Sequence, residues 1–318
     1  MAISVALLVG SLLCGWLLPR ALGRLDVRRR DPLPLLIGWL VSMAGVLVAA
    51  TTGLVLQLLP GHGVGGWAIE LVVDCWSALH HGPAPRAELW VGLLGLVVGG
   101  VAAVRLALVG GRRFSDLARE TRRHRSTLRS VGRRADSTPE TLWLAHDRPL
   151  AFSLGGRRGL IVATEGLTRA LPPAQVDAVL EHERAHLRGR HHLLIAAADA
   201  LRTVFPFVPL YAHAPHALRE LAELAADSAA ARRHGTGTVH SALTGVARHT
   251  VPRAALGMAA DAITVRMERL RHGDTGPRRS RRALACGLAA TSGLLLPFLT
   301  AFALFLGLAF TVCPLPGW

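Results

Sequence analysis

The residues best suited to chemistry lie in the stretch VLEHERAHLRGRHH at positions 179–192, which holds His182, Glu183 and His186 in the pattern H-E-x-x-H. On an α-helix, side chains four residues apart share one face, so both histidines can offer a ring nitrogen to a single metal ion. Glu183 stands beside them and can take a proton from a metal-bound water, which is how Zn²⁺ sites hydrolyse amides. The alternative is a charged helical face that contains histidines by chance, because the chain has 15 of them.

A third protein ligand is expected from the next helical stretch, RELAELAADSAAARRHG. Glu220, Glu223 and Asp227 are spaced there as i, i+3 and i+7, on a face that otherwise would be apolar and inward. A carboxylate on such a face is costly unless it is paired or bound to metal. We expect one glutamate to bind the metal and Asp227 to accept a hydrogen bond from the outer nitrogen of a ligand histidine. Spacing alone leaves Glu220 and Glu223 open, and an acidic stripe paired with arginines is the competing interpretation.

The stretch AVLEHERAHLRGRHHLL, followed by ELAELAADSAAARR, resembles the BlaR/MecR-type integral-membrane zinc metallopeptidases. HtpX-like membrane peptidases share the same order of motifs, H-E-x-x-H and then E-x-x-x-D on the next helix. The resemblance covers roughly residues 152–233 and implies a gluzincin-like domain with one Zn²⁺ per chain. It also implies that residues 152–164 supply an edge strand for an extended peptide. By position, it implies that the zinc ligands are His182, His186 and Glu223, that Glu183 is the general base, and that Asp227 supports a ligand.

Three further histidines near the motif are expected to lie outside the set of metal ligands. His213 and His216 lie in the connection between the two motif-bearing helices, where they could line the cleft and stabilise an oxyanion. His191 follows His186 by five residues, so on a continuous helix it would rotate away from the ligand face. We therefore expect His191 to be solvated or at the membrane surface.

The elements that must position these residues are two helices and a small sheet. Short apolar stretches between 142 and 167, separated by turn residues, predict two or three strands that include a hairpin. Pro172 and Pro173 are expected to open a long helix that runs to about Arg202, because proline is tolerated in the first turn. A second helix is expected from about His216 to His234.

Apolar runs indicate that this domain is attached to a membrane. The chain of 318 residues is 51% hydrophobic yet has a formal charge of +15. Runs of ~20 residues are long enough to cross ~30 Å of hydrocarbon. We expect a mainly α membrane protein with four transmembrane helices and a zinc peptidase domain that carries a small β-hairpin or sheet. The expected spans are Ile3–Leu18, Leu35–Leu59, Leu89–Val109 and Ala283–Val312. The expected domains are 1–110 (three transmembrane helices), 111–282 (peptidase domain) and 283–318 (fourth helix and tail).

The distribution of arginine predicts the orientation. The first connection, Arg20–Pro34, carries five arginines, whereas Pro60–Glu88 carries only Arg86. By the positive-inside rule, the first connection and the segment 111–282 are cytoplasmic and both termini are external. Cys75 and Cys313 would then both lie outside, as a disulfide or as two thiols.

The expected partners follow from charge and from the motif. The segment GRRFSDLARETRRHRSTLRSVGRR after the third run is suited to anionic lipid head groups at the inner face. Nucleic acid is disfavoured because aromatic residues do not alternate with the arginines, Phe114 being the single one in this segment. The predicted function is a membrane-embedded zinc endopeptidase acting on a protein or peptide, either a cytosolic repressor or the chain itself. HtpX-like quality control is the alternative, and a non-catalytic scaffold with an arginine-rich cytoplasmic face is the competing class.

Overall fold

The structure is a computed structural model that describes residues 2–26, 30–58, 85–135, 139–156, 159–250, 258–271 and 279–312. Cys75 and Cys313, the expected external cysteines, lie outside these residues. Helices dominate the described chain, with one small sheet between α4 and α5 in sequence. The elements are α1 (Ala2–Gly23), α2 (Pro32–Leu58), α4 (Pro85–Val131), β1 (Arg133–Ala135), β2 (Glu140–Leu144), β3 (Ala151–Leu154), β4 (Leu160–Thr164), α5 (Glu165–Ala170), α6 (Pro173–Arg188), α7 (His191–Val204), α8 (Pro209–His234), α9 (Thr236–Thr250), α10 (Met258–Arg271) and α11 (Arg279–Val312).

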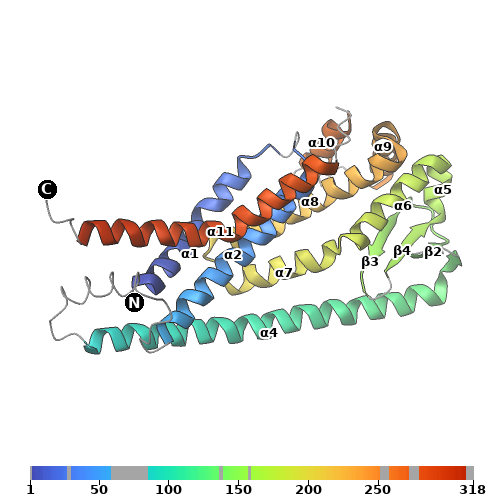
Figure 1. Cartoon of the computed structure of the whole chain (residues 1–318). Helices are drawn as coiled ribbons and strands as arrows, with labels where there is room; N and C mark the ends of the chain where they lie inside the picture. Colours follow the sequence, from blue (N-terminus) through green and yellow to red (C-terminus); the bar gives the residue numbers. More distant parts are fainter. Residues whose placement is uncertain are drawn as a thin grey trace.

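Three helices of the described chain are long and apolar enough to cross a membrane, namely α1, α2 and α11. They pack side by side (Figure 1), and small residues allow close backbone approach where they cross. A Cβ atom at Gly45 would lie 2.5 Å from the carbonyl oxygen of Gly293, and one at Gly10 would lie 2.9 Å from the backbone nitrogen of Ala301. The bundle therefore depends on glycine at these two crossings.

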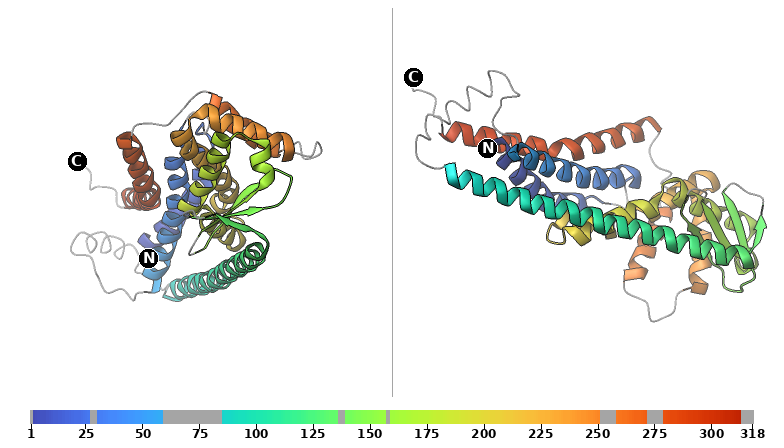
Figure 2. Two further views of the ribbon diagram at one scale, coloured as in Figure 1. Left: turned by 90° about the vertical axis from the view of Figure 1, so that its right-hand side faces the viewer. Right: turned by 90° about the horizontal axis from the view of Figure 1, so that it is seen from below.

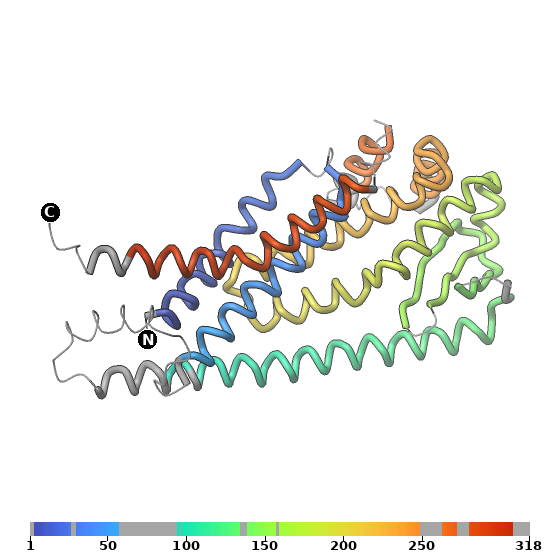
Figure 3. The backbone as a smooth tube through the Cα atoms, viewed as in Figure 1, coloured from blue at the N-terminus to red at the C-terminus, as the bar shows by residue number. Residues whose placement is uncertain are grey.

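The fourth expected span, Leu89–Val109, falls within α4, a continuous helix of 47 residues. At 1.5 Å per residue α4 is about 70 Å long, and it extends from the apolar helices to the sheet (Figure 1; Figure 3). Val97, Val101 and Leu108 in its first half are exposed, and arginines dominate its second half. The expected domain boundary at residue 110 thus lies inside one helix.

The sheet lies at the end of the molecule away from α1, α2 and α11 (Figure 2). Its strand order is β1-β2-β4-β3, with β2 and β4 parallel and the other neighbours antiparallel. The expected hairpin is present as β3 and β4. However, β4 is fully buried in the centre, so the edge strand expected over 152–164 is reduced to β3. Ile161 and Ala163 of β4 pack against Val176 and Leu180 of α6, which fixes the motif helix on the sheet.

The prediction of a single long helix from Pro173 to about Arg202 is wrong. The chain breaks after α6, and Arg190 adopts a left-handed conformation with φ 48° before α7 begins at His191. The next helix also begins earlier than expected, at Pro209 instead of His216. Proline at the first position of α8 explains this start, because its fixed φ suits a first helical turn.

The hairpin of α7 and α8 reaches into the apolar bundle. Phe205 and Val208 at its tip pack against the cluster that contains Cys14, Trp39 and Met43 of α1 and α2. The Tyr211 hydroxyl donates a hydrogen bond to the Met43 carbonyl at 3.1 Å. One end of the hairpin that carries Glu223 is therefore anchored among the apolar helices.

Candidate metal centre

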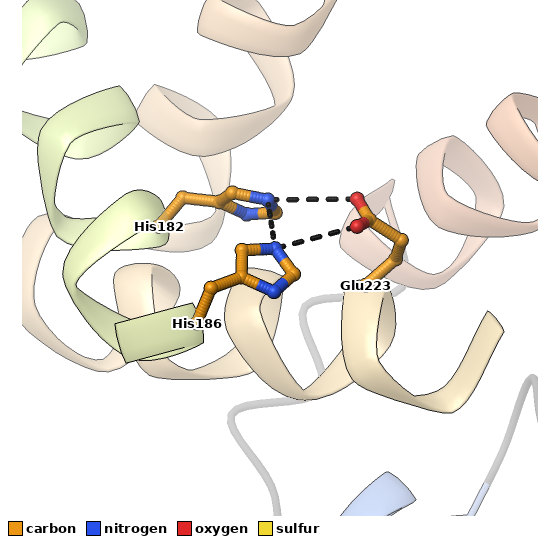
Figure 4. A group of neighbouring side chains, drawn as sticks. All are labelled: His182, His186 and Glu223. Atoms are coloured by element: carbon orange, nitrogen blue, oxygen red, sulfur yellow. Dashed lines mark hydrogen bonds and ion pairs between the residues drawn. The ribbon is translucent and has the colours of Figure 1, made fainter. Parts of the chain in front are cut away.

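His182, His186 and Glu223 converge where α6 packs against α8 (Figure 4). The close approach is possible because alanines fill the contact, with Ala178 of α6 against Ala230 and Ala231 of α8. The two histidine Nε2 atoms are 3.1 Å apart. Glu223 Oε2 lies 3.5 Å from His182 Nε2, and Glu223 Oε1 lies 3.3 Å from His186 Nε2.

These separations fit a tetrahedral zinc site. With Zn–N and Zn–O bonds of about 2.0–2.1 Å, ligand atoms at tetrahedral positions are about 3.3–3.4 Å apart. The two Nε2 atoms are close to that spacing, each lies within 3.5 Å of one Glu223 carboxylate oxygen, and one donor atom from each residue lies within 4.8 Å of the other two. The Glu223 side chain is 40% exposed, so solvent and substrate have access to the site. The group could hold a metal ion.

The outer nitrogen of His182 is held by a buried carboxylate. His182 Nδ1 lies 2.9 Å from Oδ1 of Asp227, whose side chain is 3% exposed. Burial opposes a charge on His182, but the hydrogen bonds to Asp227 and Glu223 outweigh it and raise the His182 pKa to about 10 in the metal-free protein. The same contact with His182, together with Arg266, lowers the pKa of Asp227 despite its burial. Such a carboxylate fixes the tautomer and ring orientation of a metal-binding histidine.

Arg266 of α10 completes the site and had no counterpart among the expected residues. Its Nε and Nη2 donate to Asp227 at 2.6 and 2.8 Å. Its Nη1 lies 2.9 Å from Glu223 Oε2. Three residues further along α10, Arg269 donates to the carbonyl of Arg30 in the connection between α1 and α2. Thus α10 links the site to the connection between α1 and α2, at one end of the apolar bundle.

The expectation that His191 rotates away from the ligand face is wrong. His191 is buried, and its Nδ1 lies 2.8 Å from Nδ1 of His186. The break at Arg190 redirects the chain, so that the first residue of α7 packs back against α6. Burial, followed by the neighbouring His186, lowers the His191 pKa to about 4, so His191 is neutral and its Nδ1 can accept a hydrogen bond from the Nδ1–H of His186.

Of the remaining acidic candidates, Glu183 is half-buried on α6, and its charge helps to raise the pKa of Arg266. Its carboxylate is therefore near the side of the site that Arg266 occupies. Glu220 lies almost one turn before Glu223 on α8. Within the described residues, no ion pair joins Glu220 to either histidine, whereas Glu223 contacts both.

His213 and His216 lie near the start of α8 and are exposed. His213 Nδ1 is 2.7 Å from the carbonyl of Pro209, in its own helix. At 1.5 Å per residue His216 is about 10 Å along the helix axis from Glu223. Neither histidine contacts His182, His186 or Glu223 in the part of the chain that the structure describes.

The chain is thus largely helical, with long apolar helices, and a two-histidine, one-glutamate group on packed helices could hold a metal ion. Residues 116–250 match the model of peptidase family M48. This match supports a metallopeptidase of that family, which includes BlaR- and HtpX-type peptidases. No curated protein and no solved structure gave a match. The matched segment contains α6 and α8 with all three candidate ligands, and it ends before Arg266.

Proposed function

We propose that this protein is a membrane-embedded, zinc-dependent endopeptidase in which His182, His186 and Glu223 bind the metal. The observation that carries the proposal is the convergence of these three side chains: the two Nε2 atoms are 3.1 Å apart, and each lies within 3.5 Å of a Glu223 carboxylate oxygen. A solvated acidic stripe would not bring a glutamate from α8 between two histidine nitrogens of α6. The buried contact from His182 to Asp227 adds the outer hydrogen bond that zinc histidines usually make.

The chain's own residues divide the work of hydrolysis. A bound zinc ion supplies a water of lowered pKa and polarises the scissile carbonyl. Glu183 accepts a proton during attack and returns it to the leaving amine. Asp227 holds the His182 ring, while His191 accepts a hydrogen bond from His186 Nδ1. Arg266 neutralises part of the acidic charge and fixes both carboxylates of α8.

The strand β3 is the proposed place for the substrate backbone. It forms the edge of the sheet, and within the described residues no further strand pairs with its outer side. It also packs beside α6, the helix of the motif. An extended peptide that added a strand to β3 would present its carbonyls to the metal site.

The membrane placement is also part of the proposal: four spans, including Leu89–Val109, both termini outside and the metal site in the cytoplasm. Arg269 contacts the connection between α1 and α2, and Arg266 contacts Glu223, so the site lies close to the inner boundary of the bundle. A cytosolic repressor or the chain itself is the proposed substrate. The second candidate substrates are membrane proteins, cleaved in quality control as by HtpX-like peptidases. The position of the site close to this boundary favours them.

The test combines metal content with a base variant. Protein purified without added zinc should carry one zinc per chain, and a variant with both His182→Ala and His186→Ala should carry none. Glu183→Gln should keep zinc but lower cleavage ~10²- to 10⁴-fold, because it removes only the base. Glu220→Gln is the matched control and should leave both unchanged. A folded protein without metal would refute the enzyme and favour the scaffold.

The two substrate classes can be distinguished in cells. Peptides that accumulate in cells with the wild-type protein are compared with those in cells with the Glu183→Gln variant. A single protein cleaved at one site supports regulatory proteolysis. Many membrane proteins cleaved near their cytoplasmic ends support quality control instead.

A further inference from the structure

A hollow of about 530 Å³ lies between α4, α7 and α8, outside the metal centre. It contains three guanidinium groups and one carboxylate, so its side chains carry a net charge of +2. The lining residues are Arg113, Asp199, Arg202, Thr203, Pro206 and Arg219.

The charges in the hollow are only partly paired. Arg219 Nη2 donates to Asp199 Oδ2 at 2.6 Å, which accounts for the carboxylate. Arg113 and Arg202 are exposed, and neither forms an ion pair with any described residue. Two guanidinium groups from different helices therefore face a common space without an acidic partner. Guanidinium groups match the geometry of phosphate and bind it in a bidentate manner.

The hairpin of α7 and α8 changes from apolar to charged within about one turn at this hollow. Its tip is apolar: Phe207 is 72% exposed, and a Cβ atom at Gly15, in the span of α1, would lie 2.8 Å from Val208. Arg202 and Thr203 follow one turn back along α7 at the hollow. A tip that touches the interior of a membrane span lies at hydrocarbon depth, so the charged turn lies at the phosphate level.

A second helix independently places the membrane boundary at the same level. On α4 the apolar run ends at Val109, and Arg113 follows one turn later. The helices α4 and α7 lie side by side (Figure 1), and Arg113 and Arg202 line the same hollow. The change in polarity on α4 therefore coincides with that on the hairpin.

We propose that this hollow binds the phosphate group of an anionic phospholipid, with Arg113 and Arg202 as its donors and Phe207 beside the acyl chains. The proposal rests on the membrane placement proposed above and requires neither zinc nor hydrolysis. The helices that would hold the lipid also carry His191 and Glu223 further along, so the lipid would fix the α7–α8 hairpin, and Glu223 with it, to one leaflet.

The test counts phospholipid bound to the full-length protein in detergent by native mass spectrometry, with dioleoyl phosphatidylglycerol as the probe. We expect one bound lipid per chain, and no comparable binding of dioleoyl phosphatidylcholine. Arg113→Gln with Arg202→Gln should weaken binding about 10- to 30-fold, at ~1 kcal/mol per basic side chain. Arg113→Gln alone should weaken it about fivefold, which gives a result even if the double variant does not fold.

The matched control is Arg112→Gln with Arg122→Gln, which removes the same charge from exposed positions of α4 outside the hollow. An equal loss in this control would show general surface attraction and overturn the site. Inorganic phosphate and glycerol phosphate serve as soluble competitors. Displacement of the lipid at micromolar concentration of either would assign the hollow to a free phosphate compound and overturn the lipid. Phe207→Ser should weaken lipid binding without changing zinc content.

Discussion

Zinc binding to this site should be coupled to the loss of one proton from His182, and Asp227→Asn should reveal the coupling. In the metal-free protein the hydrogen bonds to Asp227 and Glu223 raise the His182 pKa to about 10. Zinc needs the neutral ring, so it must displace that proton. At pH 7.5 the displacement costs about 3 kcal/mol, from ~1.4 kcal/mol per pH unit, and weakens apparent affinity on the order of a hundredfold.

The substitution Asp227→Asn changes the apparent zinc affinity in two opposing ways. Asparagine holds the proton on His182 less strongly, which favours zinc at neutral pH. It also orients the ring less well, a loss that typically weakens metal binding 10- to 100-fold. The wild-type affinity should therefore rise about tenfold per pH unit from pH 6.5 to 9.5, as one proton is released. The variant should have a flatter dependence, with its largest deficit at pH 9.5 and a smaller one at pH 7.

The measurement is competition for zinc with a chromophoric chelator, using the detergent-solubilised full-length protein at several pH values. Titration calorimetry in two buffers of different ionisation enthalpy counts the released protons. Asp147→Asn is the control, because the Asp147 side chain is 90% exposed and lies outside the site. Parallel pH dependences for wild type and Asp227→Asn would refute the role given to Asp227.

Three further predictions concern stability. The pKa of His182 is raised in the folded state, so protonated His182 stabilises the fold. This contribution to folding stability is fully present below pH 6.5 and is lost as the pH rises through 10. The metal-free protein should therefore melt at a lower temperature at pH 10 than at pH 7. Glu181→Ala should lower the free energy of unfolding by about 1–3 kcal/mol, because Glu181 is buried and forms ion pairs with three arginines. Thermal unfolding in detergent measures this loss, and an unchanged melting temperature would contradict the prediction. Gly166→Ala should unfold the protein more easily than the control Gly237→Ala, because its Cβ atom would lie 2.0 Å from the carbonyl oxygen of Asp147, whereas Gly237 faces open space; equal melting temperatures for the two variants would count against the packing described.

The local part of the site could be predicted from the sequence. The placement of His182 and His186 on one face follows from the helical period, which depends on no tertiary contact. The choice between Glu220 and Glu223 could not be made in this way. It depends on how α8 rotates against α6, and the alanine contact sets that rotation.

Two features of the site were missed for physical reasons. The position of His191 depends on a left-handed Arg190, a conformation that L-residues seldom adopt, although Gly189 before it was a signal for a break. Arg266 lies 39 residues after Asp227 on another helix, and no spacing rule connects them. The sequence signal for a basic partner from elsewhere in the chain was the pair of carboxylates expected on the inward face of α8, of which Asp227 is buried.

The contacts of α10 have a consequence for how the centre forms during synthesis. Both candidate ligand helices leave the ribosome before α10 does, yet the Asp227 carboxylate obtains its guanidinium partner only from Arg266. The neighbouring Arg269 joins a carbonyl 239 residues earlier in the chain. Assembly of the centre therefore requires α10 to contact the connection between α1 and α2, which is made much earlier. Such a contact has a large entropy cost of loop closure, because many residues separate its two ends. A nascent chain that already carries all of its candidate ligands still lacks the final geometry of the centre, so the proposed peptide hydrolysis would begin only after α10 has docked.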